Sequence, residues 1–191
     1  TNTAVTKKLV EQEHPDLVIL ATGARQTKPA IEGIDGKNVF MANDVLEGRA
    51  VVGRNVLIAG AGLVGLETAD FLRERAGRKS TLIDMVPAIN YGVLGVGTHL
   101  KARLDANDTR YILNASIIRF TEHGVVYRQG ESEKTAEAFD SIIIAMGSRS
   151  YNPLEAELKD LDCEVYVMGD ASQAGQANKA TEEAAAVAFR I

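Results

Sequence analysis

The stretch NVLIAGAGLVGLETADFL, residues 55–72, decides the fold. It joins an apolar run to Gly60, Gly62 and Gly65, which are spaced G-x-G-x-x-G, and then continues into a helical pattern. In a strand–turn–helix unit the first glycine allows a tight exit from the strand and the second lets a pyrophosphate approach the backbone. The third glycine lets the helix pack closely on the sheet. The stretch therefore predicts a phosphate-binding turn, and its place in the middle of the chain needs an explanation.

The sequence around this turn predicts a βαβ unit. We expect a strand over 55–60, a helix over 62–76 that stops at Gly77, and a second strand over 80–85. N–H groups at the helix start, including those of Leu63 and Val64, would face the anion.

The second strand carries Asp84 and Met85 at its end, and Asp84 follows Gly60 by 24 positions (84 − 60 = 24). An acidic residue near this spacing accepts hydrogen bonds from the adenosine ribose of a dinucleotide. Its charge would also repel the 2′-phosphate of NADP, so the sequence predicts a preference for NADH. The alternative is that Asp84 is only a solvated end of the strand.

Glu67 lies two residues after Gly65, in the first turns of the same predicted helix. One interpretation is that its carboxylate points toward the nicotinamide end of a bound dinucleotide. The other is that it is an exposed helix carboxylate, stabilised by the N-terminal helix dipole. Its position alone favours neither interpretation.

The flanking sequence predicts further helices and strands of an α/β protein. Apolar runs at 16–21, 140–147 and 164–170 are typical of strands, and the first of them is of the continuous kind expected when both faces are covered. Residues 110–128 predict short strands that turn at His123–Gly124, followed by a polar tract at 129–138. Helices are expected at 4–13, 97–107 and 176–191. The last of these carries a stripe of mostly small residues that would pack close to a backbone, formed by Ala177, Ala180, Ala184, Val187 and Ile191.

Composition narrows the class of protein. The 191 residues are 46% hydrophobic and carry a net charge of −5, with neither a membrane-length apolar run nor a basic stripe for nucleic acid. A single cysteine, Cys163, permits no internal disulfide and no C-x-x-C pair, which favours a reducing, cytoplasmic location. We interpret Cys163 as a small buried residue beside the last strand. His14, His99 and His123 are far apart in the sequence, so no metal site is expected.

The motifs together resemble those of the pyridine-nucleotide flavin oxidoreductases with two dinucleotide domains. The chain shows PDLVILATGAR, VLIAGAGLVGLETA, TLIDM, FDSIIIAMGSR, VYVMGDA and a terminal alanine-rich helix, in this order. Within the family it is most similar to the C-terminal part of the old yellow enzyme-related NADH:flavin oxidoreductases. This group contains 2-enoate reductase, 2,4-dienoyl-CoA reductase and trimethylamine dehydrogenase.

The resemblance implies why the glycine turn lies mid-chain. In this family a Rossmann-like NAD domain with a β-meander is inserted into an FAD domain, which implies an α/β fold with NAD(H)-binding residues 45–149. Residues 1–44 and 150–191 would be the C-terminal remainder of the FAD domain. The resemblance also implies that Glu67 lies near the nicotinamide and that Asp170, after Gly169, hydrogen-bonds the ribityl chain of FAD. Two strand ends would lie near the domain crossings, Thr22–Gly23 with the preceding Ala21, and Ala145, Met146 and Gly147.

The family's first glycine turn, which holds the ADP half of FAD, would precede residue 1. So would a catalytic barrel with FMN and an iron–sulfur cluster. We therefore expect this chain to be cut from a longer parent, to bind FAD poorly alone and to be inactive alone, although a homo-oligomer is compatible with the sequence.

The resemblance implies that hydride passes from NADH to FAD, and that electrons reach an enoate-type substrate in the missing part. No catalytic side chain is expected here, because the cofactors carry the chemistry. Alternatives are a disulfide reductase, an NADH oxidase or a ferredoxin reductase of the same family, or a nucleotide-binding module without turnover. The absence of C-x-x-C argues against thioredoxin reductase, and Gly169–Asp170 argues against a pure NAD module.

Overall fold

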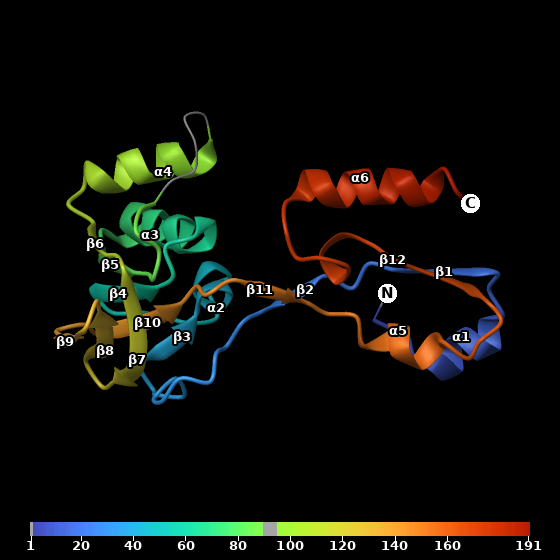
Figure 1. Cartoon of the computed structure of the whole chain (residues 1–191), viewed down its shortest axis with the longest axis horizontal. Helices are drawn as coiled ribbons and strands as arrows, with labels where there is room; N and C mark the ends of the chain where they lie inside the picture. The colour runs from blue at the N-terminus through green and yellow to red at the C-terminus, as the bar shows by residue number, and fades with distance from the viewer. Residues whose placement is uncertain (1, 90–94) are drawn as a thin grey trace. The chain divides into compact units, whose positions relative to one another are not determined.

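The computed structural model describes residues 2–89 and 95–191, and the chain divides into two compact units (Figure 1). Unit 1 consists of Thr1–Arg25 and Ser148–Ile191, and unit 2 consists of Gln26–Gly147. Unit 2 therefore begins earlier than residue 45, the expected start of the inserted domain. The reason is that β3 (Val39–Met41) pairs with a strand of the unit 2 sheet.

A five-stranded parallel sheet forms the centre of unit 2, in the order β3-β10-β4-β5-β6. The strands besides β3 are β4 (Asn55–Ala59), β5 (Lys79–Ile83), β6 (Arg110–Ile112) and β10 (Ser141–Ile144). Val56, Leu57 and Ile58 of β4 are fully buried, as expected of a parallel strand covered on both faces. The predicted α/β, Rossmann-like fold is confirmed.

Two layers cover this sheet, because alternate residues of each strand point to opposite faces. Val56, Ile58 and Leu82 pack in one apolar cluster with α3 (Leu63–Ala76) and α4 (Val96–Asp105), while Leu57 and Ile83 pack in a second cluster. The second cluster includes the meander β7 (Ala115–Thr121), β8 (Gly124–Gln129) and β9 (Ser132–Ala136). A short helix, α2 (Ala42–Leu46), follows β3 and packs in the first cluster. Figure 1 shows the helices and the meander on opposite faces.

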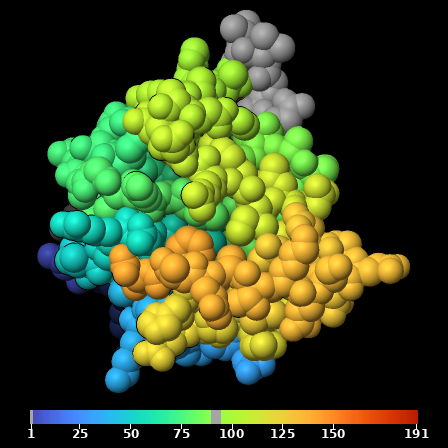
Figure 2. All heavy atoms as spheres, turned by 90° about the vertical axis from the view of Figure 1, so that its left-hand side faces the viewer, coloured from blue at the N-terminus to red at the C-terminus, as the bar shows by residue number. Residues whose placement is uncertain are grey.

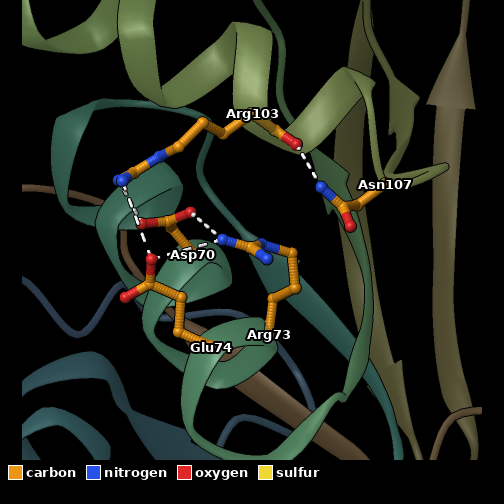
Figure 3. A network of polar contacts seen from close by, with 5 residues as sticks. All are labelled: Asp70, Arg73, Glu74, Arg103 and Asn107. Carbon is orange, nitrogen blue, oxygen red and sulfur yellow. Dashed lines mark hydrogen bonds and ion pairs between the residues drawn. The ribbon is translucent and has the colours of Figure 1, made fainter.

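A polar network joins α3 to α4 across the helical layer. Asp70, which is 5% exposed, accepts hydrogen bonds from Arg73 at 3.1 Å and from Arg103 of α4 (Figure 3). The Asn107 side chain donates to the Arg103 carbonyl oxygen at 2.7 Å, just beyond the end of α4. A buried carboxylate needs such partners, and here they fix one helix against the other.

The polar tract at 129–138 does not merely separate the meander from the next strand, contrary to expectation. Its residues Ser132–Ala136 form β9, which pairs antiparallel with β8. The sequence concealed this strand because most β9 side chains are exposed, and backbone hydrogen bonds form a ladder whatever the side chains. The turn expected at His123–Gly124 is confirmed, since Thr121 of β7 is paired with Gly124 of β8.

Unit 1 contains a two-stranded parallel sheet of β1 (Leu17–Leu20) and β12 (Glu164–Val167). Val10 of α1 (Lys7–Glu13) packs with Leu20 and with α5 (Pro153–Leu158). Ile19 remains 45% exposed, so the expectation that this first strand is covered on both faces is wrong. Helix α1 starts later than residue 4, because the Thr6 hydroxyl caps it by accepting from the Leu9 N–H at 3.3 Å.

The end of unit 1 comprises a 3₁₀ turn, η1 (Gly169–Ala171), and α6 (Ala177–Ala188). The predicted stripe on α6 is covered only in part: Val187 is buried, but Ile191 is 65% exposed and lies beyond the helix. Ala180 does approach a backbone, since a Cβ added to Gly169 would lie 3.3 Å from the Ala180 Cβ. Two short strands, β2 (Ala24–Gln26) and β11 (Ser148–Ser150), pair with each other in a further two-stranded sheet.

Candidate dinucleotide-binding site

The carboxyl edge of the unit 2 sheet brings the predicted nucleotide residues together. Strand β4 ends at Ala59, immediately before Gly60, and β5 ends at Ile83, immediately before Asp84. The Gly60 N–H donates to the Ile83 carbonyl at 2.9 Å, and the Ala145 N–H donates to the Ala59 carbonyl at 2.7 Å. Ligands of open α/β sheets bind at this edge, so its position supports the sequence-based prediction.

Two glycines of the motif are required by the backbone itself. Gly60 has φ +111°, and a Cβ there would lie 2.3 Å from the Ala145 carbonyl oxygen. A Cβ at Gly65 would lie 2.0 Å from the Gly60 carbonyl oxygen. Both distances are far inside van der Waals contact, so these glycines let the turn, β10 and α3 come together.

Gly62 differs from its two companions. Its φ of −71° and ψ of −177° are extended values that any residue adopts, and the residue is exposed. It forms the N-cap of α3. The backbone angles of this position therefore make no demand for glycine.

The start of α3 offers an anion site of the usual helical kind. Leu63, Val64 and Gly65 form its first turn, and no side chain of the described residues caps it. The first N–H groups of an α-helix have no intrahelical acceptor, and the helix dipole adds partial positive charge there. A phosphate group at this end would satisfy both.

Asp84 is held against the glycine turn. One carboxylate oxygen accepts from the Ala61 N–H at 2.6 Å, and the other accepts from the Val86 N–H at 3.2 Å. The side chain is half-buried, and the residue follows immediately after β5. The carboxylate is thus fixed beside the turn, where a ribose would have to lie if a pyrophosphate occupied the start of α3.

Four further predicted residues lie around this edge. Met85 is 69% exposed, next to Asp84. Glu67 is exposed in the second turn of α3, and Met146 is half-buried after β10. Gly147 has φ +81°, and its carbonyl oxygen accepts from the Thr27 N–H at 2.9 Å.

Thr22 and Gly23, predicted to lie near the domain crossing, and Gly169 and Asp170, predicted to contact FAD, lie in unit 1 and already have partners. The Thr22 hydroxyl donates to the Tyr151 carbonyl oxygen, and the Gly23 carbonyl accepts from the Tyr151 N–H at 3.0 Å. At η1, the Gly169 N–H donates to a Glu183 carboxylate oxygen at 2.8 Å, and an Asp170 carboxylate oxygen accepts from the Gly175 N–H at 3.1 Å.

Sequence reasoning missed Glu183. It lies on α6, fourteen residues after Gly169, and its role arises only because the helix folds back over η1. In the sequence, Glu183 is part of an alanine-rich helical pattern, which gives no reason to single it out. No sequence signal of the kind that marks the glycine turn points to this contact.

The remaining candidates form no cluster. Within residues 2–89 and 95–191, no group of three or more His, Cys, Asp or Glu side chains could hold a metal ion. Cys163 is a free, half-buried thiol just before β12. None of the helices described is both long and apolar enough to cross a membrane.

Comparison with known proteins identifies the family of this chain. The family model described as pyridine nucleotide-disulphide oxidoreductase matches residues 2–184. The chain belongs to this family. As a member of the pyridine nucleotide-disulphide oxidoreductases, it carries the fold of pyridine-nucleotide-dependent flavoproteins, and its relatives are NAD(H)-dependent oxidoreductases.

Three relatives of this family member make the resemblance more specific. An NADH oxidase from Thermoanaerobacter brockii is 31% identical over 93% of the chain, and a cinnamate reductase from Clostridium sporogenes is 32% identical over 90%. A solved 2-naphthoyl-CoA reductase complex superposes on 95% of the chain with a TM-score of 0.82 and 27% identity. The expected resemblance to the enoate reductase group is confirmed. The chain spans 28%, 26% and 28% of these proteins, respectively.

Proposed function

We propose that the carboxyl edge of the unit 2 sheet binds NADH, and that this chain is the NADH-binding portion of a larger flavin-dependent oxidoreductase. The observation that carries the proposal is the glycine turn, in which close backbone contacts require Gly60 and Gly65, while Gly62 between them is exposed and extended. These contacts fix the turn immediately before α3, whose start no side chain of the described residues caps.

Each residue of the edge has a part in this proposal. The N–H groups of Leu63, Val64 and Gly65 would bind the pyrophosphate, and Asp84 would accept hydrogen bonds from the adenosine ribose hydroxyls. Glu67 and the segment Ala145–Gly147 would border the nicotinamide end. The bound nicotinamide would supply the hydride, and the protein's own contribution is to position it.

The flavin part of the proposal depends on the family relationship. We propose that FAD binds with the remainder of the parent protein and that Gly169 and Asp170 contact it, along with Thr22 and Gly23 near the crossing. Gly169 and Asp170 are already hydrogen-bonded to Glu183 and Gly175, so FAD would have to share or replace those bonds. We also propose a cytoplasmic location, which the single cysteine favours.

The final electron acceptor divides two versions of the proposal. Similarity to a cinnamate reductase favours an enoate-type substrate, reached through FMN and an iron–sulfur cluster in the rest of the parent. Similarity to an NADH oxidase is nearly equal, at 31% against 32% identity. Both versions require NADH at the same turn, so NADH binding is the step to test first.

Replacing Gly62 by valine tests the turn. We expect NADH affinity to fall at least about a hundredfold, because the new side chain would fill the approach to the start of α3. Folding should be nearly unchanged, because φ −71° suits valine as well as glycine. Calorimetric titration with NADH measures the first effect, and thermal unfolding measures the second.

Ala30→Val is the matched control, because Ala30 is an exposed loop residue of the same unit and the change also adds a branched side chain. It should leave the NADH affinity unaltered. If Gly62→Val bound NADH as the unmodified chain does, the turn would not be the pyrophosphate site.

A further inference from the structure

A cavity of about 940 Å³ lies at the amino edge of the unit 2 sheet, where no nucleotide motif occurs. Its walls come from the starts of β4, β5 and β6, the turn after α4 and residues 137–139. Thr81, the lining residue of β5 nearest to Asp84, precedes it by three residues, which is about 10 Å at about 3.3 Å per residue. Figure 2 looks onto this side, where the yellow-green and orange segments meet. The cavity is therefore distinct from the proposed NADH site.

Strand register gathers four polar residues on one face at this edge. Asn55 is paired with Lys79, and Thr81 is paired with Arg110. Residues paired across parallel strands point to the same face, and so do Lys79 and Thr81, which are two apart on one strand. Two cations, an amide and a hydroxyl therefore share one face of the sheet and line the cavity.

The two cations carry uncompensated charge. The side chains of Lys79 and Arg110 are exposed and make no ion pair or hydrogen bond with any residue among 2–89 and 95–191. Arg78, beside them, donates through Nε to the carbonyl oxygens of Val52 and Gly53, at 3.1 and 2.9 Å. Neutral carbonyl groups leave the charge of Arg78 uncompensated as well.

Three carboxylates also line the cavity, and they do not cancel this charge. Asp105 is paired with Lys101 at 2.6 Å. Asp108 and Glu137 are exposed, in the turn after α4 and in the loop after β9. Among the described residues that line the cavity, the cations Arg78, Lys79 and Arg110 have no carboxylate partner. Two lining carboxylates, Asp108 and Glu137, have no cation partner, so the positive charges outnumber them by one.

One buried hydroxyl adds to the polar lining. Ser80, between Lys79 and Thr81, points to the opposite face of β5 from these two residues and also lines the cavity. It is 8% exposed, and its Oγ has no hydrogen-bond partner within the described residues. A buried hydroxyl without a partner costs free energy, which a ligand or its bound water could recover. Serine at this position thus favours a wet or occupied cavity over a packed one.

We propose that Lys79 and Arg110, with Asn55 and Thr81, bind the phosphate group of a small molecule at this amino edge. Lysine and arginine donors are the usual partners of phosphate, and neutral amide and hydroxyl donors complete such sites. The cavity has the size of a site for a ligand as large as a nucleotide. Unit 2 would then bind anions at both edges of one sheet.

Titration of the ¹⁵N-labelled chain with inorganic phosphate tests this site. We expect saturable shifts in the backbone amide signals of Lys79, Ser80, Thr81 and Arg110. Phosphate bound at the glycine turn would instead shift the signals of Gly60–Gly65, so the two edges are read separately. Shifts confined to the glycine turn, or an absence of saturation at the amino edge, would overturn the proposal.

A double substitution checks which side chains hold the anion. Lys79→Ala with Arg110→Ala should weaken phosphate binding at the amino edge at least about tenfold. The control, Arg128→Ala with Lys134→Ala, removes the same charge from exposed positions of β8 and β9. It should change the affinity less than about twofold. Equal weakening in both pairs would show a general charge effect and would refute a specific site.

Discussion

The two edges of the unit 2 sheet differ in how the ends of the parallel strands are held. At the carboxyl edge the backbone itself is crowded: Gly60, Gly65 and Ala145 approach so closely that no side chain fits between them. At the amino edge side chains complete the strands, as Asp140 does by accepting from the Arg54 and Asn55 N–H groups, each at 2.9 Å. Close backbone contacts at the carboxyl edge fix the conformation of the glycine turn. Side-chain caps at the amino edge are compatible with a wide, polar cavity.

Gly65→Ala should give the largest effect, because it attacks the crowding directly. The added methyl group would lie 2.0 Å from the Gly60 carbonyl oxygen, so the helix start must shift. We expect a loss of about 1–3 kcal/mol in the free energy of unfolding, net of the gain in helix propensity. Denaturant unfolding measures it.

Gly62→Ala is the control within the same motif, because its backbone is extended and the residue is exposed. It should cost well under half as much. Equal losses at both glycines would mean that crowding is not what distinguishes them.

Asp84→Asn should give an intermediate effect, on specificity more than on stability. The asparagine oxygen can still accept from the Ala61 N–H, but the negative charge that repels a 2′-phosphate is gone. We expect the ratio of NADPH to NADH affinity to rise about tenfold, measured by paired titrations. Asp84→Ala removes the turn contact as well, so it should also weaken NADH binding. An unmodified chain that preferred NADPH would contradict the role given to Asp84.

Asp140→Asn should give the smallest effect, and it tests the hydrogen bonds that the Asp140 carboxylate accepts at the amino edge. Hydrogen bonds from the Asn55 and Arg54 N–H groups lower the pKa of Asp140 below its ordinary value of 3.8. A carboxylate whose pKa is lowered by folding stabilises the protein above its unfolded pKa, and that contribution is lost as the pH falls through the folded pKa. The variant should therefore melt slightly lower than the unmodified chain at pH 7. The difference should shrink below about pH 4; a constant difference would mean that the charge is irrelevant.

Apolar patterning predicted the strands of unit 2 better than those of unit 1. The runs that contain Ile58 and Ile19 look alike in the sequence, yet Ile58 is fully buried and Ile19 is 45% exposed. The difference lies in their neighbours, since β4 has a strand on each side and a layer on each face, while β1 pairs only with β12 among the described strands. β9 is the opposite case, in which a polar tract became a strand because β8 offered it a free edge.

The candidate site shows the same limit. The sequence predicted the glycine turn and the position of Asp84, because the local geometry of a strand–turn–helix unit depends on residues close together in the chain. This applies to the spacing of Gly60, Gly62 and Gly65. Glu183 and Arg110 were not readable, because each acquires its surroundings from segments distant in sequence. Glu183 contacts Gly169 because α6 folds back over η1, and Arg110 lies beside Thr81 because of the register between β5 and β6.

By itself, the sequence determined the α/β fold, the family and the place of the glycine turn, because these follow from periodicity and from residue types with local conformational demands. Only the tertiary structure decided which glycines are required by crowding, which strand faces stay open and which cations share a face. Those properties depend on distances between residues far apart in the chain, and no local pattern records them.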